Sequence, residues 1–89
     1  NDVFEWIPNS LTKKDVLNAQ KLQELSPDTI IVTHSAGNED IYKANQVNKL
    51  VNAQTPYKLI SVGSPKSKTD LENSSSKVGA KVITQINHQ

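Results

Sequence analysis

The apolar residues of this chain fall into four short runs, separated by longer segments in which every third or fourth residue is apolar. Short runs rich in β-branched and aromatic residues, bounded by Pro, Gly or polar clusters, predict β-strands. Longer segments with a period near that of the α-helix predict amphipathic helices. We therefore expect strands at residues 3–7, 29–33, 57–63 and 81–86, and helices at residues 12–26, 37–51 and 69–78.

The run at residues 29–33 has the strongest strand character. Three aliphatic residues in a row are typical of a strand that is covered on both faces at the centre of a parallel sheet. The connections are long enough for helical crossovers, so the strands should be parallel with right-handed crossovers. We predict an α/β fold of three α/β/α layers, with a short, mostly parallel four-stranded sheet in the order β-α-β-α-β-α-β. The expected core residues are Ile30, Ile31, Val32, Leu59, Ile60, Val62, Val82 and Ile83.

Local signals predict where the helices begin and end. Thr12 and Asp15 resemble a capping box, and Thr69 and Glu72 form a second one. Gly79 stands where a helix C-terminal cap is expected. The apolar stripe expected on the middle helix consists of Ile41, Ala44, Val47, Leu50 and Val51.

Length and composition narrow the function classes. With 89 residues the chain is a single domain or a fragment of one, and its start at Asn1 without any Met indicates a piece of a longer protein. The absence of Cys excludes disulfides and thiolate metal sites, and no apolar run is long enough to span a membrane. The net charge is +1 and all ten basic residues are Lys, which argues against, without excluding, nucleic-acid binding.

Unusual residues cluster where the predicted strands end. The carboxyl ends of parallel strands share one edge of a sheet, and ligands of α/β folds bind at that edge. The predicted ends lie at Pro8 and at residues 33–37, 63–68 and 87–89. We therefore expect a site at this edge, and the candidate residues beside it are His34, Gly37, Ser64, Lys66 and Lys68.

The sequence THSAG at residues 33–37 follows a predicted strand and opens a predicted helix. It resembles the G-x-S-x-G nucleophile elbow, in which a sharp turn lifts a serine clear of the sheet. The chain is thereby similar to the lipase- and esterase-like members of the α/β-hydrolase fold. LISVGSP and KVITQINH resemble the next two strands of that family, so the resemblance covers nearly the whole chain as the second half of the family's central sheet. The segment HSAGNEDIYKA is also similar to hydrolase-like segments of filamentous-haemagglutinin-like exported bacterial proteins.

The resemblance implies roles for individual residues. Ser35 matches the nucleophile, the N–H of Ala36 matches an oxyanion-hole donor, and Gly37 matches the second Gly. Thr33 departs from the pattern, because a β-branched residue stands where the first Gly is expected. The family order of Ser, acid and His would be met within this chain by Ser35, Asp70 and His88; otherwise the acid and base lie beyond Gln89.

Ser35 could instead be an ordinary helix cap. Ser is favoured as the N-cap of a helix, where it has extended backbone angles and accepts a hydrogen bond from an N–H two or three residues on. An elbow instead requires a strained backbone with positive φ and an accessible hydroxyl. We expect the elbow geometry, and no His within about 3 Å of the Ser35 oxygen.

Three functions are compatible with these features. The first is a serine hydrolase acting on a small ester or amide, or an incomplete or degenerate remnant of one. The second is an RNase-like toxin domain of a large bacterial protein, secreted or at the cell surface, which a cognate immunity protein neutralises. Its cleft would be lined by His34, Ser35, Lys66, Lys68 and His88. The third is a non-catalytic binding or structural module. None of these three functions requires a cofactor, and we expect no metal site.

Overall fold

A computed structural model describes residues 11–86 of the chain and shows helices alternating with strands. This alternation confirms the predicted α/β class. The predicted strand at residues 3–7 lies outside the described part. The elements are α1 (Lys13–Gln23), β1 (Ile30–His34), α2 (Ala36–Leu50), β2 (Lys58–Val62), α3 (Lys68–Ser76) and β3 (Lys81–Ile86).

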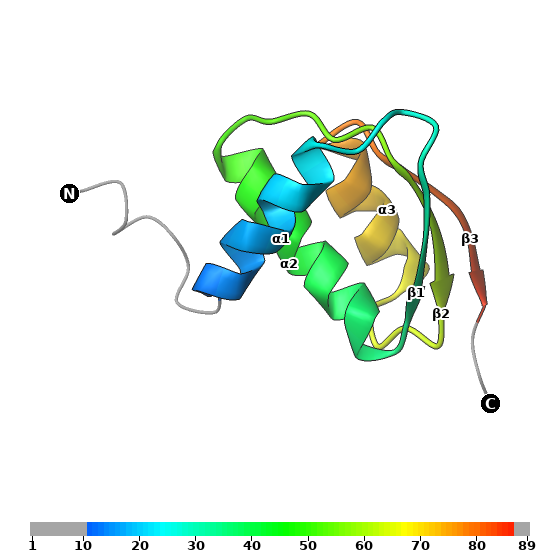
Figure 1. Ribbon diagram of the computed structural model, residues 1–89. Coiled ribbons are helices and arrows are strands. Elements are labelled where there is room, and N and C mark those ends of the chain that lie inside the picture. Colours follow the sequence, from blue (N-terminus) through cyan, green and yellow to red (C-terminus); the bar gives the residue numbers. More distant parts are fainter. Residues whose placement is uncertain (1–10, 87–89) are drawn as a thin grey trace.

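Within residues 11–86 the sheet has three parallel strands in the order β1-β2-β3, and not the predicted four (Figure 1). The central strand is β2, whereas β1 lies at an edge of the described sheet. The prediction that residues 29–33 form the centre is therefore also wrong. The register pairs Val32 with Ile60 and His34 with Val62, which aligns the carboxyl ends of β1 and β2.

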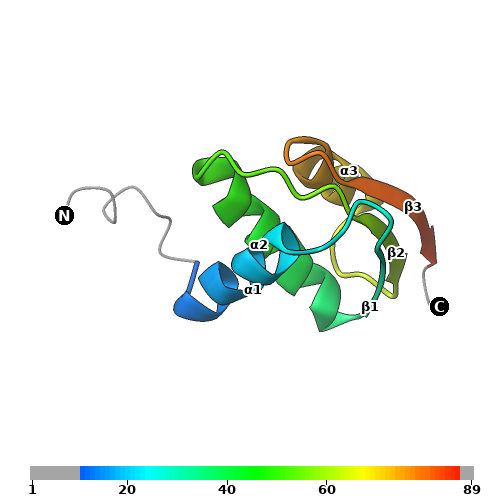
Figure 2. The same ribbon diagram turned by 45° about the horizontal axis from the view of Figure 1, so that its top comes forward.

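All three helices lie on one face of the sheet, so the described residues form two layers and not the predicted three (Figures 1 and 2). The reason is the direction in which the chain crosses the sheet. Each crossover moves one strand further the same way, from β1 to β2 and from β2 to β3. Right-handed crossovers that all advance in one direction place their helices, here α2 and α3, on the same face, and α1, which precedes β1, packs against α2.

The core lies between this helical layer and the sheet. Leu59 and Val82 are buried there as predicted, and Ile31 packs against them half-buried. Ile30, Val32 and Ile83 are exposed, with Ile30 at 55%, so their prediction as core residues is wrong. Ile60 and Val62 are only half-buried. The core residues are Leu11, Ala19, Leu22, Ala44, Val47, Tyr57, Leu59, Leu71, Val78, Ala80 and Val82.

Helix α2 buries Ala44 and Val47 of the predicted stripe and, beside them, three amides that the sequence pattern did not predict as buried. Asn38, Asn45 and Asn48 are 0–1% exposed, whereas Leu50 and Val51 at the end of the predicted stripe are exposed. Buried amides require hydrogen-bond partners, and each asparagine has them on a different neighbouring element. Asn48 ties α2 to α1: its Nδ2 donates to the carbonyl of Ala19 at 3.2 Å, and its Oδ1 accepts from Gln23 Nε2 at 2.7 Å.

Asn45 connects α2 with α3 and with the start of β2. Its Oδ1 accepts a hydrogen bond from the hydroxyl of Tyr57 at 2.7 Å, and its Nδ2 donates to Ser75 Oγ at 3.3 Å. Burial raises the pKa of the Tyr57 phenol, so this hydroxyl is a stable donor. The third asparagine, Asn38, lies beside the candidate site.

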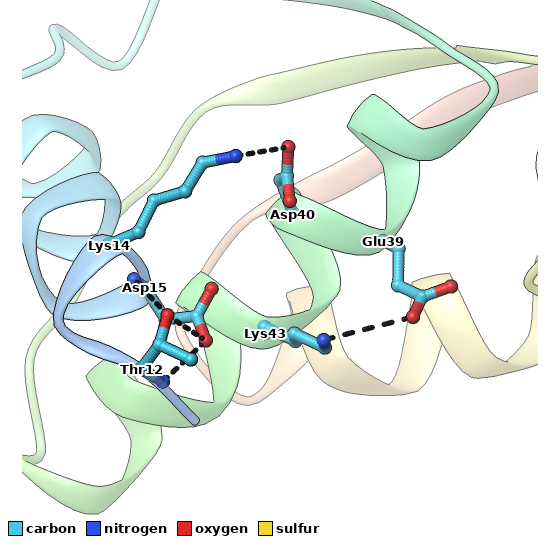
Figure 3. A network of polar contacts seen from close by, with 6 residues as sticks. All are labelled: Thr12, Lys14, Asp15, Glu39, Asp40 and Lys43. Carbon is cyan, nitrogen blue, oxygen red and sulfur yellow. Dashed lines mark hydrogen bonds and ion pairs between the residues drawn. The ribbon is translucent and has the colours of Figure 1, made fainter. Parts of the chain in front are cut away.

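Two of the three predicted helix caps are confirmed. Asp15 N–H donates to Thr12 Oγ1, and Thr12 N–H donates to Asp15 Oδ2 at 2.8 Å, which completes the predicted capping box (Figure 3). Gly79 has φ 81° in the turn that follows α3, and the N–H of the next residue, Ala80, donates back to the carbonyl of Ser75 at 2.8 Å. The predicted box at Thr69 is wrong, because the N-cap of α3 is Ser67, two residues earlier, and Thr69 lies inside the helix.

Candidate active site

The carboxyl ends of β1 and β2 meet at one edge of the sheet, and the turns that follow them lie side by side. The N–H of Ser35, the residue after β1, donates to the carbonyl of Val62 at 2.9 Å. The N–H of Gly63, the residue after β2, donates to the carbonyl of Ile86 at 2.6 Å. The first turn of α2 therefore starts directly beside the loop that leads from β2 to α3.

Ser35 has the strained backbone that an elbow requires. Its φ is 47° and its ψ is −116°, and only Asn52 shares a positive φ among the non-Gly residues of the described part. Non-Gly residues avoid this region because of steric clashes, so the conformation is maintained by its surroundings. The Ser35 hydroxyl makes no capping hydrogen bond. The predicted positive φ at Ser35 is confirmed, and the backbone expected of an ordinary N-cap is not found.

The residues after Ser35 provide backbone donors beside its hydroxyl. Ala36 and Gly37 open α2, where the first N–H groups have no carbonyl one turn earlier to bond to. Neither N–H has a backbone partner within residues 11–86, whereas the N–H of Asn38 donates back to the carbonyl of Ser35 at 3.1 Å. The positive end of the helix dipole adds to the effect of these two donors. The arrangement suits a negative charge developing next to Ser35.

A buried amide lies under the turn. Asn38 Nδ2 donates to the carbonyls of Ser35 at 3.1 Å and Val62 at 3.0 Å. Its Oδ1 accepts from the hydroxyls of Thr33 and Ser61, each at 2.5 Å. Sequence reasoning missed Asn38 and Ser61, and it read Thr33 only as a departure from the motif. A polar residue inside the apolar run of β2 was the one signal that could have pointed to this cluster.

Ser35 opens onto two neighbouring clefts that share the turn after β2. The larger, of about 620 Å³, brings Ser35 together with the predicted edge residues Ser64, Lys66 and Lys68, and also with Gly63, Pro65, Ser67 and Gln85. The smaller, of about 480 Å³, lies towards the first turns of α2 and is lined by Ser35, Ala36, Glu39, Asp40, Lys43, Gly63, Ser64 and Pro65. The larger cleft contains two lysines and no carboxylate, so its charge favours an anionic or electron-rich ligand.

The loop after β2 is held in place by several contacts. The N–H of Lys66 donates to Ser64 Oγ at 2.9 Å, and the carbonyl of Lys66 accepts from Gln85 Nε2 at 3.0 Å. The Lys66 ammonium lies 4.5 Å from the centroid of the Tyr42 ring on α2. Such a cation–π contact adds about 0.5–1 kcal/mol at an exposed site. The wall of the larger cleft opposite Ser35 is therefore a structured loop.

Neither of the described acid and base candidates, Asp70 and His34, lines a cleft with Ser35. Asp70 is exposed in the first turn of α3 and lines a separate hollow with Tyr42 and Lys49. His34 is exposed at the end of β1, and it is the one His within the described residues, since His88 lies outside them. Within residues 11–86 no hydrogen bond joins the Ser35 oxygen to a base. The described residues therefore place no hydrogen-bonded base at the Ser35 hydroxyl.

Two further features bear on the class of site. Among the described residues, no group of three His, Asp or Glu side chains is arranged to hold a metal ion. No helix in the same part of the chain combines the length and the apolar character needed to cross a bilayer.

Two ion pairs flank the first turns of α2, Lys14 with Asp40 at 3.6 Å and Lys43 with Glu39 at 3.8 Å (Figure 3).

Comparison with known proteins identifies no family. No protein-family model matches the chain, and neither a curated protein nor a solved structure is significantly similar to it. The described residues form a small α/β domain with a three-stranded parallel sheet, and its most unusual local feature is the backbone at Ser35.

Proposed function

We propose that this chain carries the nucleophile region of an α/β-hydrolase-like serine hydrolase, with Ser35 as the nucleophile towards a small ester or amide. The observation that carries the proposal is the backbone of Ser35, with φ 47°, ψ −116° and a hydroxyl free of any cap bond. This conformation follows a parallel strand and opens a helix, in the order that a nucleophile elbow requires.

The strain at Ser35 supports a functional role. A non-Gly residue in this region costs on the order of 1–3 kcal/mol, and it persists only where the surrounding structure enforces it. The first turn of a helix does not demand this cost, because Ser67 opens α3 with ordinary angles of −68° and 157°. Strained residues cluster at functional sites, where they place a reacting group. Here the strain directs a hydroxyl towards two clefts.

The proposed chemistry uses the groups around the turn. Ser35 Oγ adds to the carbonyl carbon of the substrate while its proton passes to a general base. The N–H groups of Ala36 and Gly37 donate to the oxyanion that forms. The oxyanion then collapses, the alcohol or amine leaves with the proton, and water releases the acyl group from Ser35. His88 stays the sequence-predicted base within the chain, whereas Asp70 lines a separate hollow and has no place in this step.

Labelling with a fluorophosphonate probe tests the proposal. The probe phosphorylates activated serines, so the wild-type chain should be labelled at Ser35, as located by peptide mass spectrometry. Ser35→Ala should abolish labelling. Ser67→Ala is the matched control, because Ser67 opens a helix and lines the same cleft, yet lacks the strained backbone. A wild-type chain that stays unlabelled, or labelling that survives in Ser35→Ala, would contradict the proposal.

The alternative of an RNase-like toxin domain rests on one observation. Lys66 and Lys68 line the same cleft as Ser35, as that function requires, and they could neutralise a phosphate. Expression of the chain in bacteria should then arrest growth, and Lys66→Ala with Lys68→Ala should relieve the arrest. A cognate inhibitor protein would be the partner. The hydrolase proposal is favoured over this one because the Lys66 ammonium lies against Tyr42, and the described part of the cleft holds no His.

A further inference from the structure

We infer that Asn38 is the positioning residue of the elbow: its side-chain amide holds the carbonyl of Ser35 and thereby sets the direction of both the hydroxyl and the Ala36 N–H. The inference rests on the proposed function for its catalytic meaning, although the geometry it describes is independent of activity. Asn38 touches neither cleft, so any effect on reactivity passes through Ser35.

The hydrogen-bonding capacity of the Asn38 side chain is fully used. An amide offers two donors and two acceptor lone pairs. Both donors go to backbone carbonyls, those of Ser35 and Val62, and both lone pairs go to the hydroxyls of Thr33 and Ser61. The side chain is 0% exposed, so no water competes for these partners. The amide therefore has one orientation, and it joins the turn to the carboxyl ends of both β1 and β2.

The contact with the Ser35 carbonyl fixes more than one atom. The C=O of Ser35 and the N–H of Ala36 belong to the same planar trans peptide and point in opposite directions. Asn38 Nδ2 and the Asn38 backbone N–H both donate to that carbonyl, each at 3.1 Å. Because these two donors hold the Ser35 carbonyl towards the interior, the Ala36 N–H of the same peptide points away from the interior. Asn38 thus orients the proposed oxyanion donor as well as Ser35.

Thr33 has a role in this arrangement. Its hydroxyl donates to Asn38 Oδ1 from the end of β1, two residues before the nucleophile. A glycine at this position, as in the usual motif, has no side chain that could do so. The Ser61 hydroxyl donates to the same oxygen from β2, so Asn38 is held by hydrogen bonds from two strands. The departure from the motif is accounted for by this hydrogen bond.

Another buried asparagine of α2 provides a matched control. Asn48 is 0% exposed and uses its amide on Ala19 and Gln23 of α1, far from the turn in the sequence. Asn48→Asp therefore makes the same chemical change, in the same helix and at the same burial, without touching Ser35. A loss that comes only from destabilising the fold should appear in both variants. A loss specific to positioning should appear only in Asn38→Asp, which keeps the acceptors and removes the two donors.

The first measurement is the backbone of Ser35 by NMR. A positive φ brings the amide and α hydrogens of a residue close together, so wild-type Ser35 should show a strong NOE between them. Asn38→Asp should weaken this NOE at Ser35, and Asn48→Asp should leave it unchanged. The second measurement is the rate of fluorophosphonate labelling, which Asn38→Asp should lower on the order of tenfold to a hundredfold through misplacement of the nucleophile.

The two measurements separate failure of this inference from failure of the proposed function. A strong Ser35 NOE and wild-type labelling in folded Asn38→Asp would overturn the inference. An unreactive wild-type chain would contradict the hydrolase proposal. The NOE would still decide whether Asn38 fixes the backbone conformation of Ser35. If Asn38→Asp does not fold, Thr33→Val and Ser61→Ala replace it. Each variant removes one hydrogen bond to Asn38 Oδ1, so each should weaken the Ser35 NOE in part. An NOE that is unchanged in both variants would overturn the inference.

Discussion

Ser35 and Ser67 open consecutive helices at the same edge of the sheet and line the same cleft, yet their local structures differ completely. Ser67 has φ −68° and ψ 157°, and its hydroxyl accepts from the N–H of Asp70 at 3.1 Å. Ser35 has φ 47° and ψ −116°, and its hydroxyl caps nothing. One serine stabilises its helix, and the other holds its hydroxyl free next to the helix start.

The lengths of the connections account for much of this difference. A single residue separates β1 from α2, so the chain must reverse its direction at Ser35 alone. Residues 63–67 separate β2 from α3, and the reversal is shared among them. The third residue after each serine adds to the contrast, because Asn38 is buried beneath its turn while Asp70 is exposed. A short connection and a buried polar support together account for a serine that is exposed and does not cap its helix.

The largest expected effect is at the residues three positions after each serine. Asn38→Ala leaves two carbonyls and two hydroxyls with fewer partners in the interior, and each such group costs about 1–3 kcal/mol. We expect a loss of at least about 2 kcal/mol in the free energy of unfolding, measured with urea. Asp70→Ala removes only a first-turn acid and should cost less than about 1 kcal/mol. Equal losses would remove the basis for treating the two turns as different.

Substitution by glycine should act in opposite directions at the two serines. Ser35→Gly relieves a strain of about 1–3 kcal/mol at the expense of about 0.5–1 kcal/mol of backbone entropy, so the net gain is about 1 kcal/mol. Ser67→Gly should lower stability by only a few tenths of a kcal/mol, roughly the usual cost of glycine at an N-cap. Thermal unfolding of both variants checks the sign. A destabilised Ser35→Gly would mean that the turn is not strained.

Removal of the two hydroxyls should also give unequal results. Ser67→Ala loses an N-cap bond and should cost about 1 kcal/mol. Ser35→Ala loses no hydrogen bond within the described residues, so its change should stay within about 0.5 kcal/mol. Urea unfolding curves of the two variants, recorded side by side, provide the measurement. If Ser35→Ala cost as much as Ser67→Ala, the Ser35 hydroxyl would have a structural partner.

The smallest expected effect tests how closely strand and helix approach at the elbow. A Cβ placed on Gly37 would lie 3.7 Å from Thr33 Cβ, which is an ordinary contact distance. Gly37→Ala should therefore be tolerated and should gain about 0.5 kcal/mol from the higher helix propensity of alanine. Differential scanning calorimetry can detect the accompanying rise in Tm. A clear loss of stability would show that this glycine is needed for close packing, as it is in the usual motif.

The sequence by itself determined the features that depend on neighbours in the chain. The three strands within residues 11–86, the capping box at Thr12 and the turn at Gly79 were all predicted from local patterns. Each of these features is set by residues within about five positions of one another, so the order of residue types carries enough information to predict it. The turn at Ser35 was predicted from the THSAG motif, although part of its support comes from β2.

Only the tertiary structure decided the layers and the support of the site. Three aliphatic residues in β1 indicated burial on both faces, yet Ile30 and Val32 are exposed because every described helix packs on the other face. Asn38 reads as a solvent-facing polar residue in a helix. Its partners Ser61 and Val62 lie more than twenty positions away, and they reach it only after β2 has paired with β1. An amide can be buried only where such partners converge, and local sequence does not encode that convergence.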